Sequence, residues 1–374
     1  MSFFILSFVI SQAQQWIQLT TAGSSPSGRY GHTGVYDSND NRMIIFGGNI
    51  SGVLTNEVWV LTNCDGISGT TTWIQLTTTG SPPPSRYTHS AVYDLSNNRM
   101  IIFGGYDGAN WKNDVWVLNN ANGLGGTPTW TQLSPTGGPP HARAANSAVY
   151  DPNNNIMITF DGGAGGSSFN DVWVLTNANG LGGTPAWSQL SITGSSPTTR
   201  TAHTAIYDST NNIMTIFGGN IPGSAYLNDT WVLSYANGSG GTPTWTQLSP
   251  TGSLPTTRWY HTVVSNTVNN QMVIFGGGYF GGPYLDDTWI LTNSNGLGGT
   301  PAWNEILPTG SKLTTRELHC SIYNPNTDRM TIFGGYNNGS SLNDTWVLTN
   351  VSNGTPIKDW MDYIKEPDIY RSIK

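Results

Sequence analysis

The chain contains little charge and few glutamates. Its 374 residues include 15 Lys and Arg and 22 Asp and Glu, which gives a formal net charge of −7. Charged residues make up 10% of the chain, against about 25% in an ordinary soluble domain. A nucleic-acid-binding protein normally carries a basic excess, so this composition argues against nucleic-acid binding. Only four glutamates occur (Glu57, Glu305, Glu317 and Glu366), which leaves little material for paired-glutamate acid–base catalysis.

Cysteines and long apolar runs are also scarce. Cys64 and Cys320 are the only cysteines, too few for a disulfide framework, so we expect two free thiols. No run is long enough for a membrane span of about 20 residues. Residues 3–10 (FFILSFVI) precede Ser11-Gln12-Ala13, which predicts a secretory signal peptide over residues 1–13 and a secreted or extracytoplasmic protein, although the usual positive charges are missing. Alternatively, this run packs on the fold and the protein is cytoplasmic.

Glycine and aromatic residues are abundant, and they recur at a fixed period. The chain has 46 Gly and 15 Trp, enough apolar surface to argue against disorder. One Trp series opens a W-x-x-L-like strand at Trp16, Trp73, Trp130, Trp187, Trp245 and Trp303. A second series lies at Trp59, Trp116, Trp173, Trp231, Trp289 and Trp346. Both repeat every 57 or 58 residues, which indicates a repeat architecture rather than two or three unrelated domains.

Each unit is predicted to form four short strands. In the second unit these are Trp73–Leu76, Arg86–Tyr93, Arg99–Phe103 and Val115–Leu118. The run RMIIF at 99–103 is apolar throughout, as expected of a strand covered on both faces. The cluster Asp94–Asn98 (DLSNN) predicts a turn, because Asp and Asn side chains bond nearby backbone groups.

Six four-stranded units buried on both faces predict a β-propeller. The order R-x-x-H, apolar strand, Gly-Gly and N/D-D-x-W resembles the kelch repeat, and it covers residues 16 to about 349. The resemblance implies an all-β, six-bladed kelch propeller of the galactose-oxidase-like superfamily, over residues 14–350. We expect Trp16–Leu19 to pair with the last unit and close the ring, which removes free sheet edges. Residues 351–374 are predicted to form a charged tail.

The Arg of the R-x-x-H element recurs in all six units, at Arg29, Arg86, Arg143, Arg200, Arg258 and Arg316. Its place after a Pro-rich turn predicts that it lies where the inner strand begins. The kelch resemblance implies that this rim and its loops bind partners, and guanidinium groups suit carboxylates or phosphates. An equally weighted interpretation predicts that each Arg satisfies the carbonyl groups of its neighbour. Both interpretations stay open at this point.

The His of the same element recurs five times, with Asn146 in the third unit. One His per blade around a ring is too dispersed for a metal, which needs three or four convergent ligands. We therefore predict a structural role and expect no metal or cofactor. The Gly pairs lead from strand to strand, unlike phosphate-binding loops, which open a helix. The third unit departs further, since Asp161 replaces the first Gly, through drift or to form a local polar site.

The loops after the Gly pairs are predicted to share the face of the Arg residues, and they differ between units. Aromatic residues are frequent there, and Trp259 directly follows Arg258. Variable loops on a rigid scaffold are where binding usually occurs. Some of these rings are expected to fill gaps between blades instead. The candidate ligand-binding residues, besides the six Arg, are Trp111, Tyr226, Trp259, Tyr279, Tyr284 and Glu317.

Two kelch-type enzymes offer an alternative function. Galactose oxidase needs a Tyr–Cys cross-link and a copper site, and no matching constellation surrounds Cys320. Sialic acid epimerases also resemble kelch propellers, and for that chemistry we name Arg258, Arg316 and Glu317 near the substrate. Our first hypothesis is a binding scaffold, monomeric, that recognises a protein or glycan on the Arg-bearing face. The enzyme of sugar metabolism is the alternative, because fold analogy does not decide function.

Overall fold

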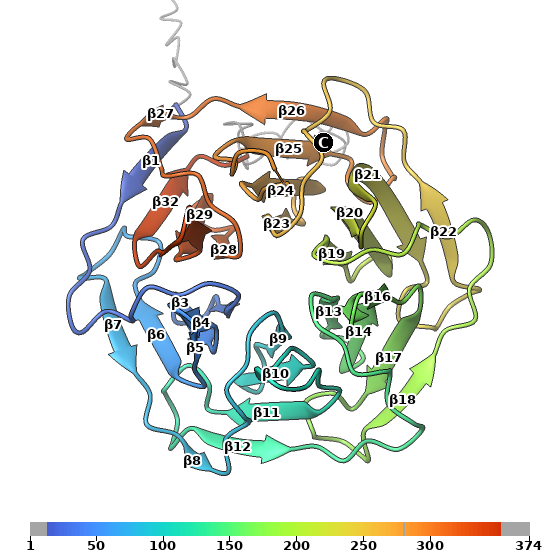
Figure 1. Cartoon of the computed structure of the whole chain (residues 1–374), viewed down its shortest axis with the longest axis horizontal. Helices are drawn as coiled ribbons and strands as arrows, with labels where there is room; N and C mark the ends of the chain where they lie inside the picture. Colours follow the sequence, from blue (N-terminus) through green and yellow to red (C-terminus); the bar gives the residue numbers. More distant parts are fainter. Residues whose placement is uncertain (1–12, 280, 353–374) are drawn as a thin grey trace, which may run out of the picture.

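The computed structural model describes residues 13–279 and 281–352. In these residues all regular structure is β, and six sheets are arranged around a central axis like blades (Figure 1). Blade 1 contains β2 (Thr33–Asp37), β3 (Arg42–Phe46), β6 (Val58–Thr62) and β7 (Thr72–Gln75). Blade 2 contains β9 (Ser90–Asp94), β10 (Arg99–Phe103), β11 (Val115–Asn119) and β12 (Thr129–Gln132). Blade 3 contains β13 (Ser147–Asp151), β14 (Ile156–Phe160), β17 (Val172–Thr176) and β18 (Ala186–Gln189).

The second half of the ring follows the same plan, from the inner strand outward. Blade 4 contains β19 (Thr204–Asp208), β20 (Ile213–Ile221), β21 (Ala225–Ser234) and β22 (Thr244–Gln247). Blade 5 contains β23 (Thr262–Asn266), β24 (Gln271–Phe275), β25 (Thr288–Thr292) and β26 (Ala302–Ile306). Blade 6 contains β28 (Cys320–Asn324), β29 (Arg329–Phe333), β32 (Thr345–Thr349) and β1 (Gln15–Gln18).

Short strands decorate these blades. Three hairpins, each made of two two-residue strands, follow the Gly pairs or their equivalent: β4 (Asn49–Ile50) with β5 (Val53–Leu54), β15 (Gly163–Ala164) with β16 (Ser167–Ser168), and β30 (Tyr336–Asn337) with β31 (Ser340–Ser341). In blade 4 the long β20 and β21 form the corresponding hairpin themselves. On the outside, β8 (Thr79–Gly80) and β27 (Thr309–Gly310) pair in parallel with β12 and β1.

The ring closes as predicted from the sequence. β1 pairs antiparallel with β32, with Trp16 opposite Leu348 and Gln18 opposite Trp346. The first strand of the chain is thus the outermost long strand of the last blade, beside it in Figure 1. This pairing ties the two ends of the propeller together without leaving an open edge between blades 6 and 1.

The core lies between neighbouring blades. The second strands are buried almost throughout, as for Met100–Phe103, which confirms that these apolar runs are covered on both faces. The outer-strand Trp of each blade packs on the Phe that precedes the Gly pair, or its equivalent, in the preceding blade, as Trp130 does on Phe46 with ring centroids 5.0 Å apart. The same contact recurs in all six blade pairs, at 4.7–5.1 Å, so this Trp series repeats because every blade interface needs it.

The inner strands begin later than the sequence predicted. In blade 2 the strand begins at Ser90 rather than Arg86, because Thr88 has a φ of +51° and left-handed backbone cannot continue a strand. The Arg-x-x-His segment is therefore a turn. The described residues contain no helix long and apolar enough to cross a membrane, and Cys64 and Cys320 are both free and buried. The predicted signal peptide (up to residue 12) and the tail (from residue 353) lie outside the described residues.

Candidate functional site

Each repeated Arg is buried inside its own blade. Arg86 donates to both carboxylate oxygens of Asp114, at 2.7 and 2.9 Å, and to the carbonyl of Gly104 at 2.9 Å. The indole of Trp116 donates to the same carboxylate at 2.7 Å. Burial by itself raises the pKa of Asp114, but the hydrogen bonds and charge of Arg86 outweigh it and hold this pKa below its usual value. The Arg, Gly-Gly and D-x-W elements of the motif are thus one hydrogen-bonded unit.

The same unit occurs in all six blades, which corrects the prediction of an Arg rim. The six Arg side chains have no solvent-exposed surface, and each is neutralised by an acidic residue, so none of these six guanidinium groups is available to a ligand. The alternative of pairing with a neighbour's carbonyls is also inexact, because the principal partner is a carboxylate of the same blade. These partners are Glu57, Asp114, Asp171, Asp229, Asp287 and Asp344.

The repeated His residues join one blade to the next. The Nε2 of His89 lies 2.8 Å from the hydroxyl of Thr33, the first residue of the preceding inner strand. The equivalent partners are Ser147 for His203, Thr204 for His261, Thr262 for His319 and Cys320 for His32. Asn146 makes the same link to Ser90 at 3.1 Å. Burial lowers the pKa of His32 to about 3, so these imidazoles are neutral structural groups at physiological pH.

The third-blade exception is also structural. Asp161 has a φ of +53° and is fully buried, and its carboxylate accepts a hydrogen bond from the backbone N–H of Arg200. At the interface between blades 2 and 3 the corresponding N–H, that of Arg143, donates to the carbonyl of Lys112. Burial raises the pKa of Asp161 well above its usual value. Asp161 therefore lies in the interface between blades 3 and 4 and not on a surface that a ligand reaches.

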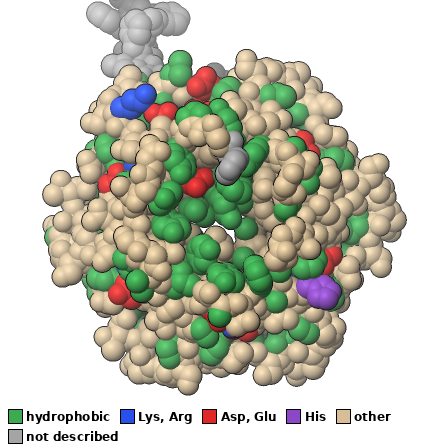
Figure 2. Space-filling view, viewed as in Figure 1, with side chains coloured by type: hydrophobic (Ala, Val, Ile, Leu, Met, Phe, Trp, Pro, Cys, Tyr) green, Lys and Arg blue, Asp and Glu red, His purple; other side chains and the backbone are tan. Residues whose placement is uncertain are grey.

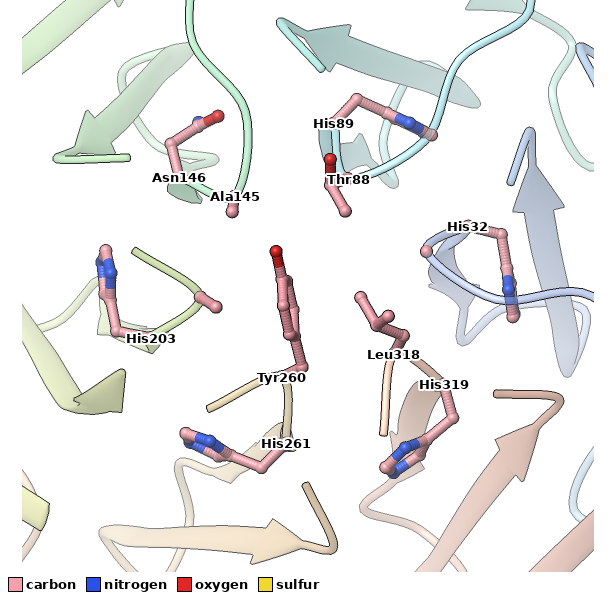
Figure 3. Close-up of a pocket in the computed structure, with 12 residues that line it drawn as sticks. His32, Thr88, His89, Ala145, Asn146, His203, Tyr260, His261, Leu318 and His319 are labelled. Atoms are coloured by element: carbon pink, nitrogen blue, oxygen red, sulfur yellow. The ribbon is translucent and has the colours of Figure 1, made fainter. Parts of the chain in front are cut away.

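A closed ring of backbone hydrogen bonds surrounds the channel just inside the Arg residues. The residue before each His donates its N–H to the carbonyl of the equivalent residue in the preceding blade, at 2.8–3.0 Å, and the N–H of Gly31 closes the ring on Leu318. All six have a φ between +50° and +65°. We call this ring the collar: Gly31, Thr88, Ala145, Ala202, Tyr260 and Leu318. It borders a cavity of about 140 Å³, into whose centre the Tyr260 ring projects (Figure 3).

The variable loops lie beside the residue that follows each Arg. That residue forms a β-bridge with the first residue after the Gly pair, or its equivalent in blade 3, as in Tyr87 with Tyr106 and Trp259 with Gly278. The bridge recurs in all six blades, so the loops and these residues share one face. We call it the channel-mouth face. Hydrophobic side chains gather on it around the central opening (Figure 2).

Aromatic rings form two connected groups on this face. In the first, Trp111, Tyr106 and Tyr87 lie in series, with ring centroids 5.1 and 6.1 Å apart; the series continues through Tyr30 and Tyr336 to Tyr284. In the second, Tyr226 contacts both Trp259, at 5.4 Å, and Tyr279, at 6.5 Å. Trp259 in turn contacts Tyr260 of the collar at 4.9 Å.

A groove of about 300 Å³ lies between the first aromatic group and blades 3 and 4. Tyr87, Tyr106 and Trp111 line one side. Blade 3 contributes only small residues to the lining, because Ala144 and the Gly163–Ser167 turn stand where blade 2 has aromatic rings. Every side chain that lines the groove is uncharged at neutral pH. Such a surface suits stacking and hydrogen bonding to an uncharged ligand segment.

Glu317 is the one predicted acidic residue of this face, and it lies between the two aromatic groups. It bridges Tyr336 through the backbone, and its carboxylate accepts a hydrogen bond from the side chain of Trp259. Burial raises its pKa to about 7, because this hydrogen bond does not offset the desolvation. Among residues 13–279 and 281–352 no Lys, Arg or His pairs with it.

The structure separates the sequence-predicted site residues into two groups. Its aromatic candidates Trp111, Tyr226, Trp259, Tyr279 and Tyr284, together with Glu317, belong to the two aromatic groups or lie between them. The six Arg do not belong to this face. Sequence reasoning missed the collar and the small residues Ala144 and Gly163 that line the groove. The variation at the position after each Arg, with five residue types in six blades, was a usable signal that this position differs in role from the Arg.

Comparison with known families agrees with this architecture. The family model of the KLHDC2/KLHL20/DRC7 Kelch-repeats domain matches residues 4–180 and 182–354. The chain belongs to this Kelch-repeat family. The match covers the six blades, so the repeated Arg, Gly-Gly and D-x-W unit described above is the structural basis of the kelch motif in this chain.

Individual relatives are more distant. The chain is similar to Adagio-like protein 3 of Oryza sativa subsp. japonica, with 26% identity over 77% of this chain and 43% of the relative. It is also similar to the leucine-zipper-like transcriptional regulator 1 homolog of Drosophila melanogaster, with 27% identity over 71% of this chain and 26% of the relative. The chain thus spans less than half the length of these relatives.

Among solved structures, the chain resembles the one titled "Structure of YjhT", with a TM-score of 0.61 and 15% identity over 86% of this chain and 95% of the other. At that identity the likeness shows the fold alone.

Proposed function

We propose that this Kelch-repeat propeller is a binding scaffold that holds a segment of a protein or a glycan on its channel-mouth face. The observation that carries the proposal is the uncharged groove beside Trp111, about 300 Å³ in volume. Its lining combines the exposed Trp111 ring and the half-buried rings of Tyr87 and Tyr106 with small residues of blade 3. Such a concave site, carried by loops on a rigid scaffold, is the usual arrangement for ligand binding.

The contrast with the Arg residues supports this assignment. The polar groups that repeat in every blade already have partners within the fold. The Arg, Asp and Trp side chains bond to one another, and the His side chain bonds to the preceding blade. The groove is formed where blades 2, 3 and 4 differ. A scaffold whose unique residues gather at one concave site is best explained by a ligand at that site.

The sugar-metabolising alternative loses two of its three residues. Arg258 and Arg316 are fully buried and paired with Asp287 and Asp344, so neither can hold a substrate. Glu317 remains on the face, and in the part of the chain that the structure describes no Lys, Arg or His forms an ion pair with it to assist acid–base chemistry. Binding without catalysis is therefore the proposal that the described residues support.

The test is a screen of the protein against a glycan array and a displayed peptide library, with two matched variants. Trp111 is 39% exposed in the groove, and Tyr235 is 40% exposed in the loop after β21, on the opposite face. Trp111→Ala should weaken the selected ligand at least tenfold, and Tyr235→Ala should leave it unchanged. Equal loss in both variants, or no selective ligand from either library, would refute the proposal. Enrichment on one library alone decides between peptide and glycan.

A further inference from the structure

Glu317 is an unusual residue at its position. The two residues between Arg and His face the channel mouth in every blade, twelve positions in all, and Glu317 is the only one of these that is charged. Its neighbour Arg316 does not neutralise it, because that guanidinium is bonded to Asp344 and to the carbonyl of Gly334. Glu317 is 9% exposed. A carboxylate so deeply buried without a cation is costly unless something else compensates its charge.

The space around this carboxylate depends on the absence of a side chain at Gly278. A Cβ at Gly278 would lie 3.1 Å from Glu317 Oε2, 3.4 Å from the Tyr284 ring and 3.9 Å from Trp259 Nε1. Gly278 does not have a positive φ, so its backbone conformation does not require glycine. The lack of a side chain instead leaves space for the Glu317 carboxylate. The carboxylate, an indole and a phenol ring therefore converge on one point beside blade 5.

Aromatic rings border this point on both sides. Trp259 lies against Tyr260 at 4.9 Å, and Tyr284 lies edge-on to Tyr336 at 6.1 Å. The negative faces of aromatic rings attract cations, most strongly where water is excluded. A carboxylate among such rings is the combination that recognises an ammonium group, whose charge the carboxylate neutralises and whose alkyl stem the rings cover.

We propose, on the basis of the proposed binding function, that Glu317 and the rings of Trp259, Tyr260, Tyr284 and Tyr336 receive the ammonium group of a lysine side chain from a polypeptide partner. Since only 9% of Glu317 is exposed, an unbranched alkyl stem fits the approach better than a sugar ring. The groove beside Trp111, which Tyr260 also lines, then holds an uncharged segment of the same partner.

The protonation state of Glu317 makes the proposal measurable. Burial raises its pKa to about 7, and the ligand's ammonium group needs the deprotonated form. Of the titratable groups that face it, Tyr260 and Tyr284 have pKa values raised by burial and then by Glu317 itself, and Tyr336 is a third phenol. The nearby imidazoles of His261 and His319 have pKa values that burial lowers far below 6.5. Glu317 is thus the group of this site that titrates between pH 6 and 8.

The experiment uses the full chain and three probes: the peptide acetyl-Gly-Gly-Lys-Gly-Gly-amide, the same peptide with norleucine in place of lysine, and glucosamine. Binding is measured by NMR titration to 10 mM probe. The lysine peptide should bind at least tenfold more tightly than the norleucine peptide at pH 8. Its affinity should rise about tenfold from pH 6 to pH 8, as the fraction of deprotonated Glu317 rises. Glucosamine should not compete.

Variants complete the design. Glu317→Gln should abolish both the lysine preference and the pH dependence, whereas Glu305→Gln, which removes an exposed charge from the outer strand β26, should change neither. Gly278→Ala, tolerated by its backbone, should weaken the lysine peptide by crowding the carboxylate. Equal binding of the two peptides, no binding of the lysine peptide at 10 mM, an unaffected Glu317→Gln protein with native circular dichroism, or Glu317-dependent binding of glucosamine alone would each overturn the inference. The Trp111-dependent ligand of the screen would stand regardless, so the two proposals fail separately.

Discussion

Two adjacent positions of the repeat differ in both burial and variability. The Arg of the R-x-x-H element is identical in six blades, buried and bonded to an acid of its own blade. The next residue is Tyr, Tyr, Ala, Thr, Trp or Glu, and it faces the channel mouth. A propeller needs the same internal bonds in each blade, whereas a ligand touches the blades unequally. Repetition therefore marks the scaffold and variation marks the candidate site.

The largest expected effect comes from removing a repeated Arg. Arg86→Ala leaves the carboxylate of Asp114 buried without its cation, and we expect a loss of about 3–5 kcal/mol in the free energy of unfolding. Tyr87→Ala, one residue along, should cost only about 1 kcal/mol, because its ring is half-buried on the surface. Urea denaturation of both variants measures the difference. Similar losses for the two would break the division between scaffold and face.

Asp161 offers a way to strengthen the scaffold. Asp161→Gly restores the residue found in the other five blades, relieves a positive φ and removes a buried carboxyl, so we expect a gain of about 1–2 kcal/mol at pH 7. Because burial raises the folded-state pKa of Asp161, its penalty grows as pH rises above the unfolded value of about 4. The gain should therefore be smaller at pH 4 than at pH 7 in thermal denaturation. A destabilised variant at pH 7 would show that blade 3 needs this acid.

The His links predict how the scaffold responds to acid. The folded-state pKa of His89 lies well below its ordinary value, so the unfolded chain binds protons first. Stability contributed by the neutral imidazole is complete above about pH 6.5 and is lost as pH falls towards the folded value, at about 1.4 kcal/mol per pH unit for each His.

His89→Asn copies the natural Asn146 link and tests this directly. The variant should lose stability less steeply between pH 6.5 and 5 than the original chain, by about that slope for one His. Denaturant titrations at each pH measure it, with the exposed His141 changed to Asn as the control. An unchanged slope in His89→Asn would mean that His89 is already protonated in the fold.

The sequence was sufficient for the fold because the fold is made of repeated local patterns. The Trp period, the apolar second strands and the Gly pairs predicted six blades, and the opening Trp16 strand predicted the ring closure. These patterns predict the fold because each unit repeats the same packing, such as Trp130 on Phe46. Six copies of one pattern therefore indicate six copies of one structural unit.

The candidate site was less predictable, for a physical reason. We predicted Arg86 and His89 on one strand, but the positive φ of Thr88 turns the chain there, and no local sequence pattern identifies a non-glycine residue in that conformation. The acidic partner of Arg86 lies 28 residues away, so its neutralisation appears only in three dimensions. The groove likewise depends on Ala144 and Gly163, whose importance lies in being small beside the Tyr87 and Trp111 rings.

The most direct test of the central claim is hydrogen–deuterium exchange of the full chain with and without the ligand selected by the screen. The account predicts added protection in the channel-mouth segments, residues 106–112, 163–168 and 259–260, with no change in the opposite-face loops at 63–71 and 235–243. Protection confined to those opposite-face loops would contradict it and place the binding surface on the other side of the propeller.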